Sequence, residues 1–102
     1  MKSFSQGDIL KIEGFRFKFL VVSKNAYIRS TRTFHVCPLL NGVPEGPLHI
    51  AVTGEKGECG VVHCEQIKLI DSEKRACTRI DRLHYRDIME ISDALQGIFE
   101  YD

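Results

Sequence analysis

The sequence predicts one small domain of the mainly β class, a barrel-like sheet of five to six short strands followed by a C-terminal helix. Short segments rich in β-branched and aromatic residues, separated by glycine-containing turns, extend to residue 70. The hydrophobic spacing changes to three and four residues only in the last quarter, which is typical of an amphipathic helix. With 102 residues, 43% of them hydrophobic, we expect a single domain over residues 1–102.

Turn signals divide the sheet-forming part into segments in which apolar and polar residues alternate. Pro38 lies inside the third segment and favours an edge strand or a bulge, because proline has no N–H to donate. The predicted strands are residues 9–12, 15–23, 33–40, 48–52, 60–65 and 66–70, the last two being separate strands or one bent strand. Residues 23–32 are predicted as a loop with one helical turn, 41–47 as a long connection and 53–58 as a hydrophilic turn.

Phenylalanine alternates with cations in the second predicted strand. Phe15, Phe17 and Phe19 project from one face, and Arg16 and Lys18 from the other. We expect the aromatic face to lie in the core rather than under nucleic-acid bases, and the cationic face to lie outside.

The last quarter of the chain predicts an amphipathic helix of about four turns that packs one apolar stripe on the sheet. No Lys or Arg follows Arg86, so this helix is not expected to face a nucleic acid. The apolar residues at helical spacing are Ile88, Ile91, Leu95, Ile98 and Phe99.

Charge is balanced overall but not along the chain. The 14 basic and 14 acidic residues cancel, which gives no global field toward a nucleic acid or a membrane. Residues 1–33 nevertheless carry a net charge of +5, and residues 34–102 carry −5. In the basic part, Lys18, Arg29 and Arg32 suit contacts to phosphate.

No segment predicts membrane insertion or secretion. The longest apolar run, residues 19–22, is far shorter than the roughly 20 residues that span a bilayer, and no apolar leader follows the N-terminus. The cysteines Cys37, Cys59, Cys64 and Cys77 contain no C-x-x-C pair. We therefore expect a cytoplasmic protein with reduced, mostly buried thiols.

The histidines do not predict a metal centre. His63 precedes Cys64, but adjacent strand residues face opposite sides and no second ligand pair has suitable spacing. We therefore expect neither a metal nor a cofactor. His35 and His49 lie in strand-like segments and are expected to be half-buried or partner-facing rather than catalytic.

Several segments, read together, resemble one known family. They are Gly-Asp-Ile-Leu at residues 7–10, Phe-Leu-Val-Val-Ser at 19–23, Ala-Tyr-Ile-Arg at 26–29, Cys-Glu-Gln-Ile-Lys-Leu-Ile-Asp at 64–71 and Ser-Asp-Ala-Leu at 92–95. In this order, over nearly the whole chain, they resemble the MazF/PemK toxin family of bacterial toxin–antitoxin modules, which includes the Kid toxin. The resemblance implies an SH3-like barrel and a homodimer. It also implies a metal-independent endoribonuclease that inhibits growth by cleaving single-stranded mRNA, and an antitoxin whose flexible tail blocks the site.

The resemblance also implies an active site. The acid after the cysteine can serve as general base and the residue two before it as general acid, which are Glu65 and His63 here. Residues i and i+2 of a strand share a face, and an imidazole is suited to donate a proton near neutral pH. Arg16 or Lys18 would stabilise the phosphorane, and Asn41 would position the phosphate or a base.

Two positions depart from the family pattern. Phe17 and Lys18 stand where many members have Arg-Pro, and Leu40 and Asn41 stand where the family has Thr-Ser. They leave open a second interpretation, a degenerate barrel that binds an antitoxin or a nucleic acid without cutting RNA. A third interpretation follows the related CcdB fold, whose toxin poisons DNA gyrase through its C-terminal end, here residues 98–102.

Overall fold

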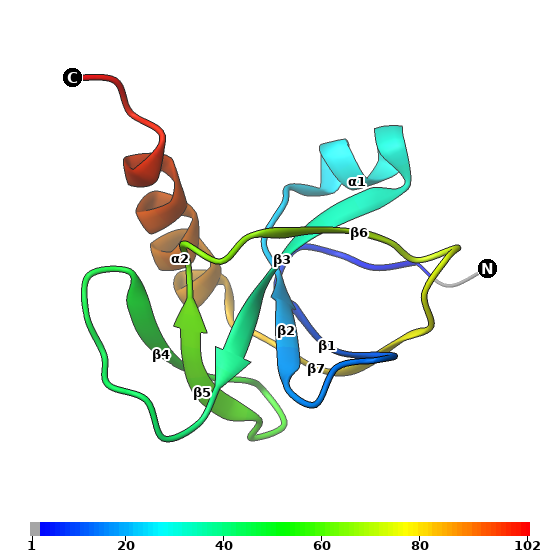
Figure 1. The fold of residues 1–102 in the computed structure, drawn as a ribbon, viewed down its shortest axis with the longest axis horizontal. Coiled ribbons are helices and arrows are strands. Elements are labelled where there is room, and N and C mark those ends of the chain that lie inside the picture. The colour runs from blue at the N-terminus through cyan, green and yellow to red at the C-terminus, as the bar shows by residue number, and fades with distance from the viewer. Residues whose placement is uncertain (1–2) are drawn as a thin grey trace.

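The computed structural model describes residues 3–102 as one curled antiparallel sheet with two helices (Figure 1). The predicted mainly β class and C-terminal helix are confirmed, and the sheet has seven strands rather than five to six. The elements are β1 (Asp8–Ile12), β2 (Lys18–Val21), α1 (Asn25–Thr31), β3 (Thr33–Leu40), β4 (His49–Thr53), β5 (Cys59–His63), β6 (Lys68–Asp71), β7 (Cys77–Arg82) and α2 (Tyr85–Ile98).

The strands follow the order β4-β5-β3-β2-β1-β7, with β6 pairing the first half of β3. β5 pairs the other end of β3. The segment between β5 and β6 therefore carries the chain from the end of β3 to its start. Within residues 3–102, no strand pairing joins the edge strands β4 and β7. A backbone hydrogen bond of 2.9 Å, from the Glu55 N–H to the Arg82 carbonyl, connects the β4–β5 turn to β7 instead.

The strand that the sequence did not predict is β7. Its apolar residues Cys77 and Ile80 are three apart, with Thr78 and Arg79 between them, so it lacks the period-two pattern of a half-buried strand. Pairing with β1 over five residue pairs overrides this weak local signal.

The sheet has an apolar core on each face, because neighbouring residues of a strand project to opposite sides. The core on the α2 side includes Ile9, Leu20, Leu39, Val62 and Ile91. The core on the other face, enclosed by β1, β2, β3, β6 and β7, includes Leu10, Phe19, Phe34, Val36 and Ile70. Each of these side chains contributes about 1.5–3 kcal/mol by its burial.

Pro38 lies in a central strand, so the expectation of an edge position or a bulge is wrong. The Val22 N–H donates to the His35 carbonyl, which means that alternate β3 residues from His35 onward bond toward β2. Pro38 therefore turns its nitrogen away from β2. It lies where the pairing of β3 with β6 has stopped and its pairing with β5 has not yet started. The missing N–H falls where no strand is paired.

The second predicted strand is shorter than expected, because residues 13–17 form a turn before β2. Phe19 is buried as predicted, but Phe17 is 38% exposed, and its ring centroid lies 5.0 Å from that of Phe19 and 6.1 Å from that of Phe15. The predicted helical turn in residues 23–32 is the seven-residue helix α1.

The predicted burial of most cysteines is confirmed. Cys37, Cys64 and Cys77 are buried, whereas Cys59 is exposed. None of the helices among residues 3–102 combines the length and the apolar composition that a membrane crossing requires.

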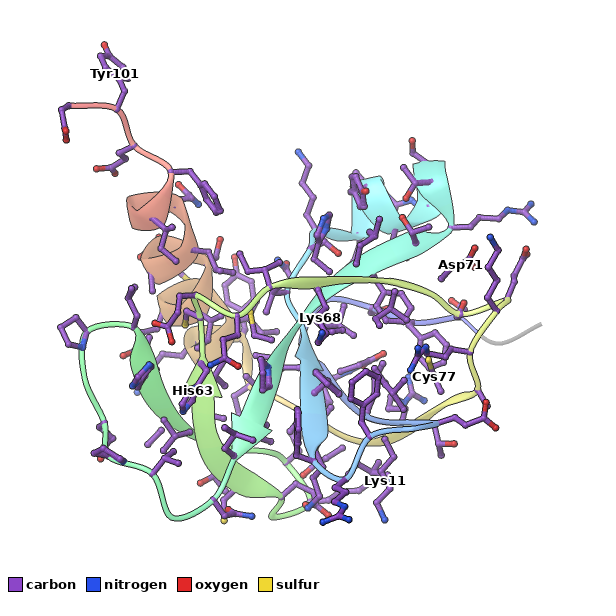
Figure 2. The ribbon with its side chains drawn as sticks, in the orientation of Figure 1. Lys11, His63, Lys68, Asp71, Cys77 and Tyr101 are labelled. Carbon is purple, nitrogen blue, oxygen red and sulfur yellow. The ribbon has the colours of Figure 1, made fainter. Side chains whose placement is uncertain are left out.

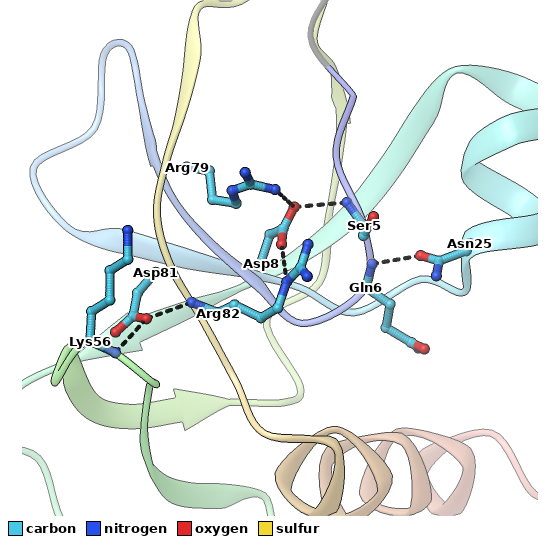
Figure 3. A network of polar contacts seen from close by, with 8 residues as sticks. All are labelled: Ser5, Gln6, Asp8, Asn25, Lys56, Arg79, Asp81 and Arg82. Carbon is cyan, nitrogen blue, oxygen red and sulfur yellow. Dashed lines mark hydrogen bonds and ion pairs between the residues drawn. The ribbon is translucent and has the colours of Figure 1, made fainter.

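Two buried aspartates hold the ends of β1 and β7 (Figure 3). Asp8 accepts the Nε–H of Arg82 at 3.1 Å, and Asp81 accepts the backbone N–H groups of Lys56 and Arg82 at 2.8 and 2.7 Å. A Cβ on Gly54 would lie 2.2 Å from the Asp81 carboxylate, so only glycine leaves room for this carboxylate. Asp81 thus ties the β4–β5 turn to β7, in place of the missing strand pairing.

We expect Asp81→Asn to destabilise the fold by about 1–3 kcal/mol at pH 7, because an amide has one acceptor oxygen where the carboxylate has two. Burial raises the pKa of Asp81, but the backbone N–H groups of Lys56, Arg82 and Glu58 outweigh burial, and the pKa is lowered overall. The carboxylate therefore stabilises the fold above the ordinary aspartate pKa of about 3.9, and this contribution is lost as pH falls through the lowered pKa. Urea unfolding at neutral and acidic pH measures the effect.

The difference in unfolding free energy between wild type and Asp81→Asn should narrow in acid. Asp93→Asn, on the exposed side of α2, is the matched control and should change little. A difference of the same size at both pH values would contradict the assignment.

Candidate active site

Two histidines lie opposite each other on neighbouring strands. His49, the first residue of β4, pairs in register with His63, the last residue of β5. Their imidazole rings stack with centroids 4.1 Å apart and planes 14° apart. The antiparallel pairing places both rings on one face of the sheet, opposite to the face of Val62 and Cys64.

Glu65 completes this cluster from the turn that follows β5. Its Oε1 lies 2.6 Å from the Nε2 of His49 and 4.0 Å from the Nδ1 of His63. The structure therefore brings the two sequence-predicted groups, His63 and Glu65, together, and adds a third group that the sequence analysis had set aside. We call His49, His63 and Glu65 the His–Glu cluster.

The members of the His–Glu cluster differ in exposure. The side chains of Glu65 and His49 are 40% and 33% exposed, whereas that of His63 is 12% exposed. Both ring nitrogens of His63 are buried and have no hydrogen-bond partner within the described residues. His49 and Glu65 can therefore meet a ligand directly, and His63 lies behind His49.

An open hollow of about 590 Å³ lies between the ends of β3, β4 and β5 and the start of α2. Leu40, Ala51 and Val61 line it, and each shares the face of His49 and His63 by strand alternation and pairing. Asn41, a predicted substrate contact, also lines this hollow. None of the three members of the His–Glu cluster lines the hollow, which lies further along β4 and β5, toward Asn41.

Lys18 lies on the opposite face of the sheet. It pairs in register with Leu39, which is buried in the core on the α2 side, and its ammonium forms an ion pair with Glu58. Arg16 is exposed in the turn before β2. The structure therefore does not bring Lys18 to the His–Glu cluster.

Lys68 is a cation on the face of the His–Glu cluster that sequence analysis did not select. Lys68 pairs with Val36, and strand alternation puts Val36 on the same face of β3 as Leu40. Leu40 in turn pairs with Val61, which lies on the same face of β5 as His63. The Nζ of Lys68 lies 5.7 Å from the ring centroid of Phe15. Figure 2 shows His63 on the β4–β5 side and Lys68 nearer the middle of the sheet.

Arg29 and Arg32 lie at the other end of β3, around α1. Arg32 Nη1 is 3.9 Å from Glu73 Oε1, and both arginines line a separate hollow with Ile28 and Phe34. The start of β3 is five residues from Pro38, or about 17 Å at strand spacing. The structure does not bring these two arginines to the His–Glu cluster.

Cys64 is isolated from its neighbour His63, as adjacent strand positions predict. Burial, with the Glu65 charge as a smaller cause, raises the pKa of the Cys64 thiol to about 11, and burial raises that of Cys37 to about 12. Both thiols stay protonated at neutral pH, so neither is a nucleophile or a ready metal ligand.

Structural comparison gives the class of protein. The chain aligns with MazF in the MazE–MazF complex (Form-I) of Deinococcus radiodurans at 20% identity and a TM-score of 0.82, over 96% of this chain and 97% of that one. It aligns with a mycobacterial endoribonuclease in complex with its cognate antitoxin at 16% identity and a TM-score of 0.81, over 98% and 100% of the two chains. At these identities the likeness shows that the fold is that of MazF toxins.

The sequence itself gives the family. Residues 10–99 match the family model of the PemK-like, MazF-like toxins of type II toxin–antitoxin systems. The protein therefore belongs to this family. No protein of curated function matches the chain.

We expect one fast-reacting thiol in the folded protein. Iodoacetamide at neutral pH should label Cys59 first, because Cys59 is exposed while burial keeps Cys37 and Cys64 protonated. Mass spectrometry of the labelled peptides measures the order. Cys59→Ser should abolish the fast phase, and rapid labelling of Cys64 in folded protein would contradict its placement behind the sheet.

Proposed function

We propose that this protein is a growth-inhibiting toxin that cleaves single-stranded mRNA in the cytoplasm, without a metal, through attack by the RNA's own 2′-OH. The observation that carries the proposal is the ion pair between His49 and Glu65 on an open sheet face, backed by His63. Family membership supports the toxin assignment, and a solved structure of the same fold is named an endoribonuclease.

The chemistry needs one base and one acid. The Glu65 carboxylate accepts the proton of the 2′-OH, and the oxygen attacks the neighbouring phosphorus. The bond from phosphorus to the 5′-oxygen breaks, and this oxygen takes a proton from an imidazolium. The products are a 2′,3′-cyclic phosphate and a 5′-OH. The reaction requires Glu65 as the carboxylate and His49 as the imidazolium, and the two groups lie 2.6 Å apart.

Two imidazoles are candidates for the acid. Sequence analysis selected His63, whose ring nitrogens are covered, whereas the nearer and more exposed ring is His49. We propose that His49 donates to the leaving oxygen and that His63, stacked on its ring, positions it. A direct role of His63 as acid requires that the His49 ring moves aside.

Contacts to the substrate follow the hollow beside the His–Glu cluster. Asn41 is suited to hold a phosphate or a base at one end, and Lys68 supplies a cation on the same face. Arg16 stays a proposal for the phosphorane, because the turn before β2 leaves its side chain exposed. Lys18, Arg29 and Arg32 would contact only the flanking RNA.

We also propose a homodimer and a protein antitoxin as partners. An apolar groove of about 390 Å³, lined by residues that include Ile67, Leu95 and Phe99, lies between the C-terminal part of α2 and the residues that follow β2 and precede β6. Phe99 is 73% exposed, and the large apolar side chain of Leu69 is exposed on β6. A surface of this kind is typical of a protein interface.

A binding module without catalysis is the second candidate function. The observation that favours it is the placement of Lys18 on the other face and of the hydrocarbon side chain of Leu40 in the hollow. Neither gives a phosphate the contact that the family resemblance implies. A CcdB-like action on gyrase through residues 98–102 would not involve the His–Glu cluster at all.

We expect purified wild-type protein to cleave single-stranded RNA in EDTA and to leave 2′,3′-cyclic phosphate ends. Glu65→Gln and His49→Gln should each lower the rate by about 10²–10⁴, because each removes one proton-transfer group. Primer extension and analysis of the cleaved ends measure the rate and the chemistry. His63→Gln should reduce the rate less than His49→Gln if it acts by positioning.

Glu90→Gln, at an exposed position of α2, is the matched control and should cleave like wild type. Cleavage that survives both Glu65→Gln and His49→Gln would refute this mechanism. Growth arrest without any RNA cleavage would favour the binding module, or a gyrase-directed toxin if arrest depends on residues 98–102.

We expect Phe99→Asp to weaken a homodimer more than tenfold, because it places a charge in the apolar groove. Light scattering at a series of concentrations should give twice the chain mass for wild type and the chain mass for Phe99→Asp. Tyr85→Ser, which alters an exposed aromatic residue at the start of α2, is the control. A variant that stays dimeric would place the interface elsewhere.

A further inference from the structure

The His–Glu cluster has the composition of a transition-metal site. Two imidazoles and one carboxylate are a common three-ligand set for zinc, which leaves a fourth position for water or another ligand. One donor atom from each of His49, His63 and Glu65 can be chosen such that all lie within 4.8 Å of one another. Cys64, the neighbour that the sequence suggests as a ligand, faces the other side of the sheet.

The distances in the cluster are close to those that zinc requires. With bonds of about 2.0–2.2 Å, the ligand atoms of a tetrahedral zinc lie roughly 3.3–3.6 Å apart. Glu65 Oε1 lies 2.6 Å from His49 Nε2 and 4.0 Å from His63 Nδ1. The first pair must separate and the second approach, each by less than about 1 Å, which side-chain rotation achieves.

Ring orientation is the larger adjustment. The imidazole planes are nearly parallel, at 14°, so the ring-nitrogen lone pairs do not yet converge. His49 is one-third exposed at the first position of β4, which allows its ring to tilt. A metal would in return give a partner to a buried nitrogen of His63, which has no hydrogen bond within the described residues.

We propose that His49, His63 and Glu65 bind one Zn²⁺ per chain, and that this zinc inhibits the toxin. The inhibition rests on the proposed function, since zinc would occupy the carboxylate lone pair that accepts the 2′-OH proton and the imidazole nitrogen that donates to the leaving oxygen. Because zinc binds a neutral imidazole, any proton on the ligating nitrogen of His49 is released into solvent when zinc binds. Zinc here is an inhibitor of metal-independent chemistry, not a cofactor.

Binding is tested without any activity measurement. Titration of wild-type protein with Zn²⁺ in a calorimeter should give one site per chain, and Co²⁺ should give the visible absorption of a four-coordinate ion that Zn²⁺ then displaces. His49→Gln and Glu65→Gln should each weaken zinc binding by more than about 100-fold. Loss of a residue that only hydrogen-bonds to a metal ligand weakens binding by at most about 100-fold, and loss of a ligand itself should cost more. His84→Gln and Cys59→Ser, at the other exposed histidine and the exposed thiol, should bind like wild type.

Affinity that is unchanged in both His49→Gln and Glu65→Gln, or is lost in His84→Gln or Cys59→Ser, would overturn the site. Absence of saturable Zn²⁺ and Co²⁺ binding by wild type would overturn it as well. His63→Ala provides a second test of the cluster, since a deletion of the stacked ring should also weaken binding.

RNA cleavage with increasing Zn²⁺ tests the inhibition. The activity of the metal-free protein, measured without a chelator, should fall as the site fills, with the midpoint at the affinity measured by titration. Cobalt absorption without RNA cleavage under any condition would leave the metal site intact and refute the proposed function. Cleavage that is present in EDTA and persists when EDTA is replaced by saturating Zn²⁺ would support the proposed function and overturn the inhibition.

Discussion

The pairing of β4 with β5 is the constraint on which the candidate site depends. Their register sets His49 against His63, and a shift by one residue would turn one of the two rings into the core of Val52 and Val62. The turn of residues 54–58 holds this register, because its backbone N–H groups bind the buried Asp81 of β7. A carboxylate on a distant strand therefore positions the catalytic candidates.

The crossing from β5 to β6 adds the third group of the cluster. β3 has two partners on one side, β6 at its start and β5 at its end, and Pro38 stands between them with no N–H to offer. The chain must leave the sheet at this point, and Glu65 lies in the turn that results. Proline in a central strand is thus part of the reason that a carboxylate lies beside the two rings.

Much of the fold and part of the site could be predicted from the sequence. Spacing by two predicted that His63 and Glu65 meet, and alternation predicted that Cys64 faces away. His49 was within reach of the same reasoning, since a hairpin centred on Lys56 pairs the residues seven positions on either side, 49 and 63. The face on which Lys18 lies could not be predicted in this way. It depends on where the turn of residues 13–17 ends and β2 begins, and the side-chain pattern alone does not determine that position.

The position of His63 connects the two proposals. A buried imidazole without a hydrogen-bond partner is costly, and a bound ligand that gives its nitrogen a partner relieves this cost. RNA cannot supply that partner while the His49 ring covers His63, but a small cation placed between the two rings and Glu65 can. The groups that make the cluster suitable for proton transfer, an ionised carboxylate and a basic imidazole, are also good zinc ligands. Occupation by one partner therefore excludes the other, which would make the stacked pair a point where metal availability controls the proposed RNA cleavage.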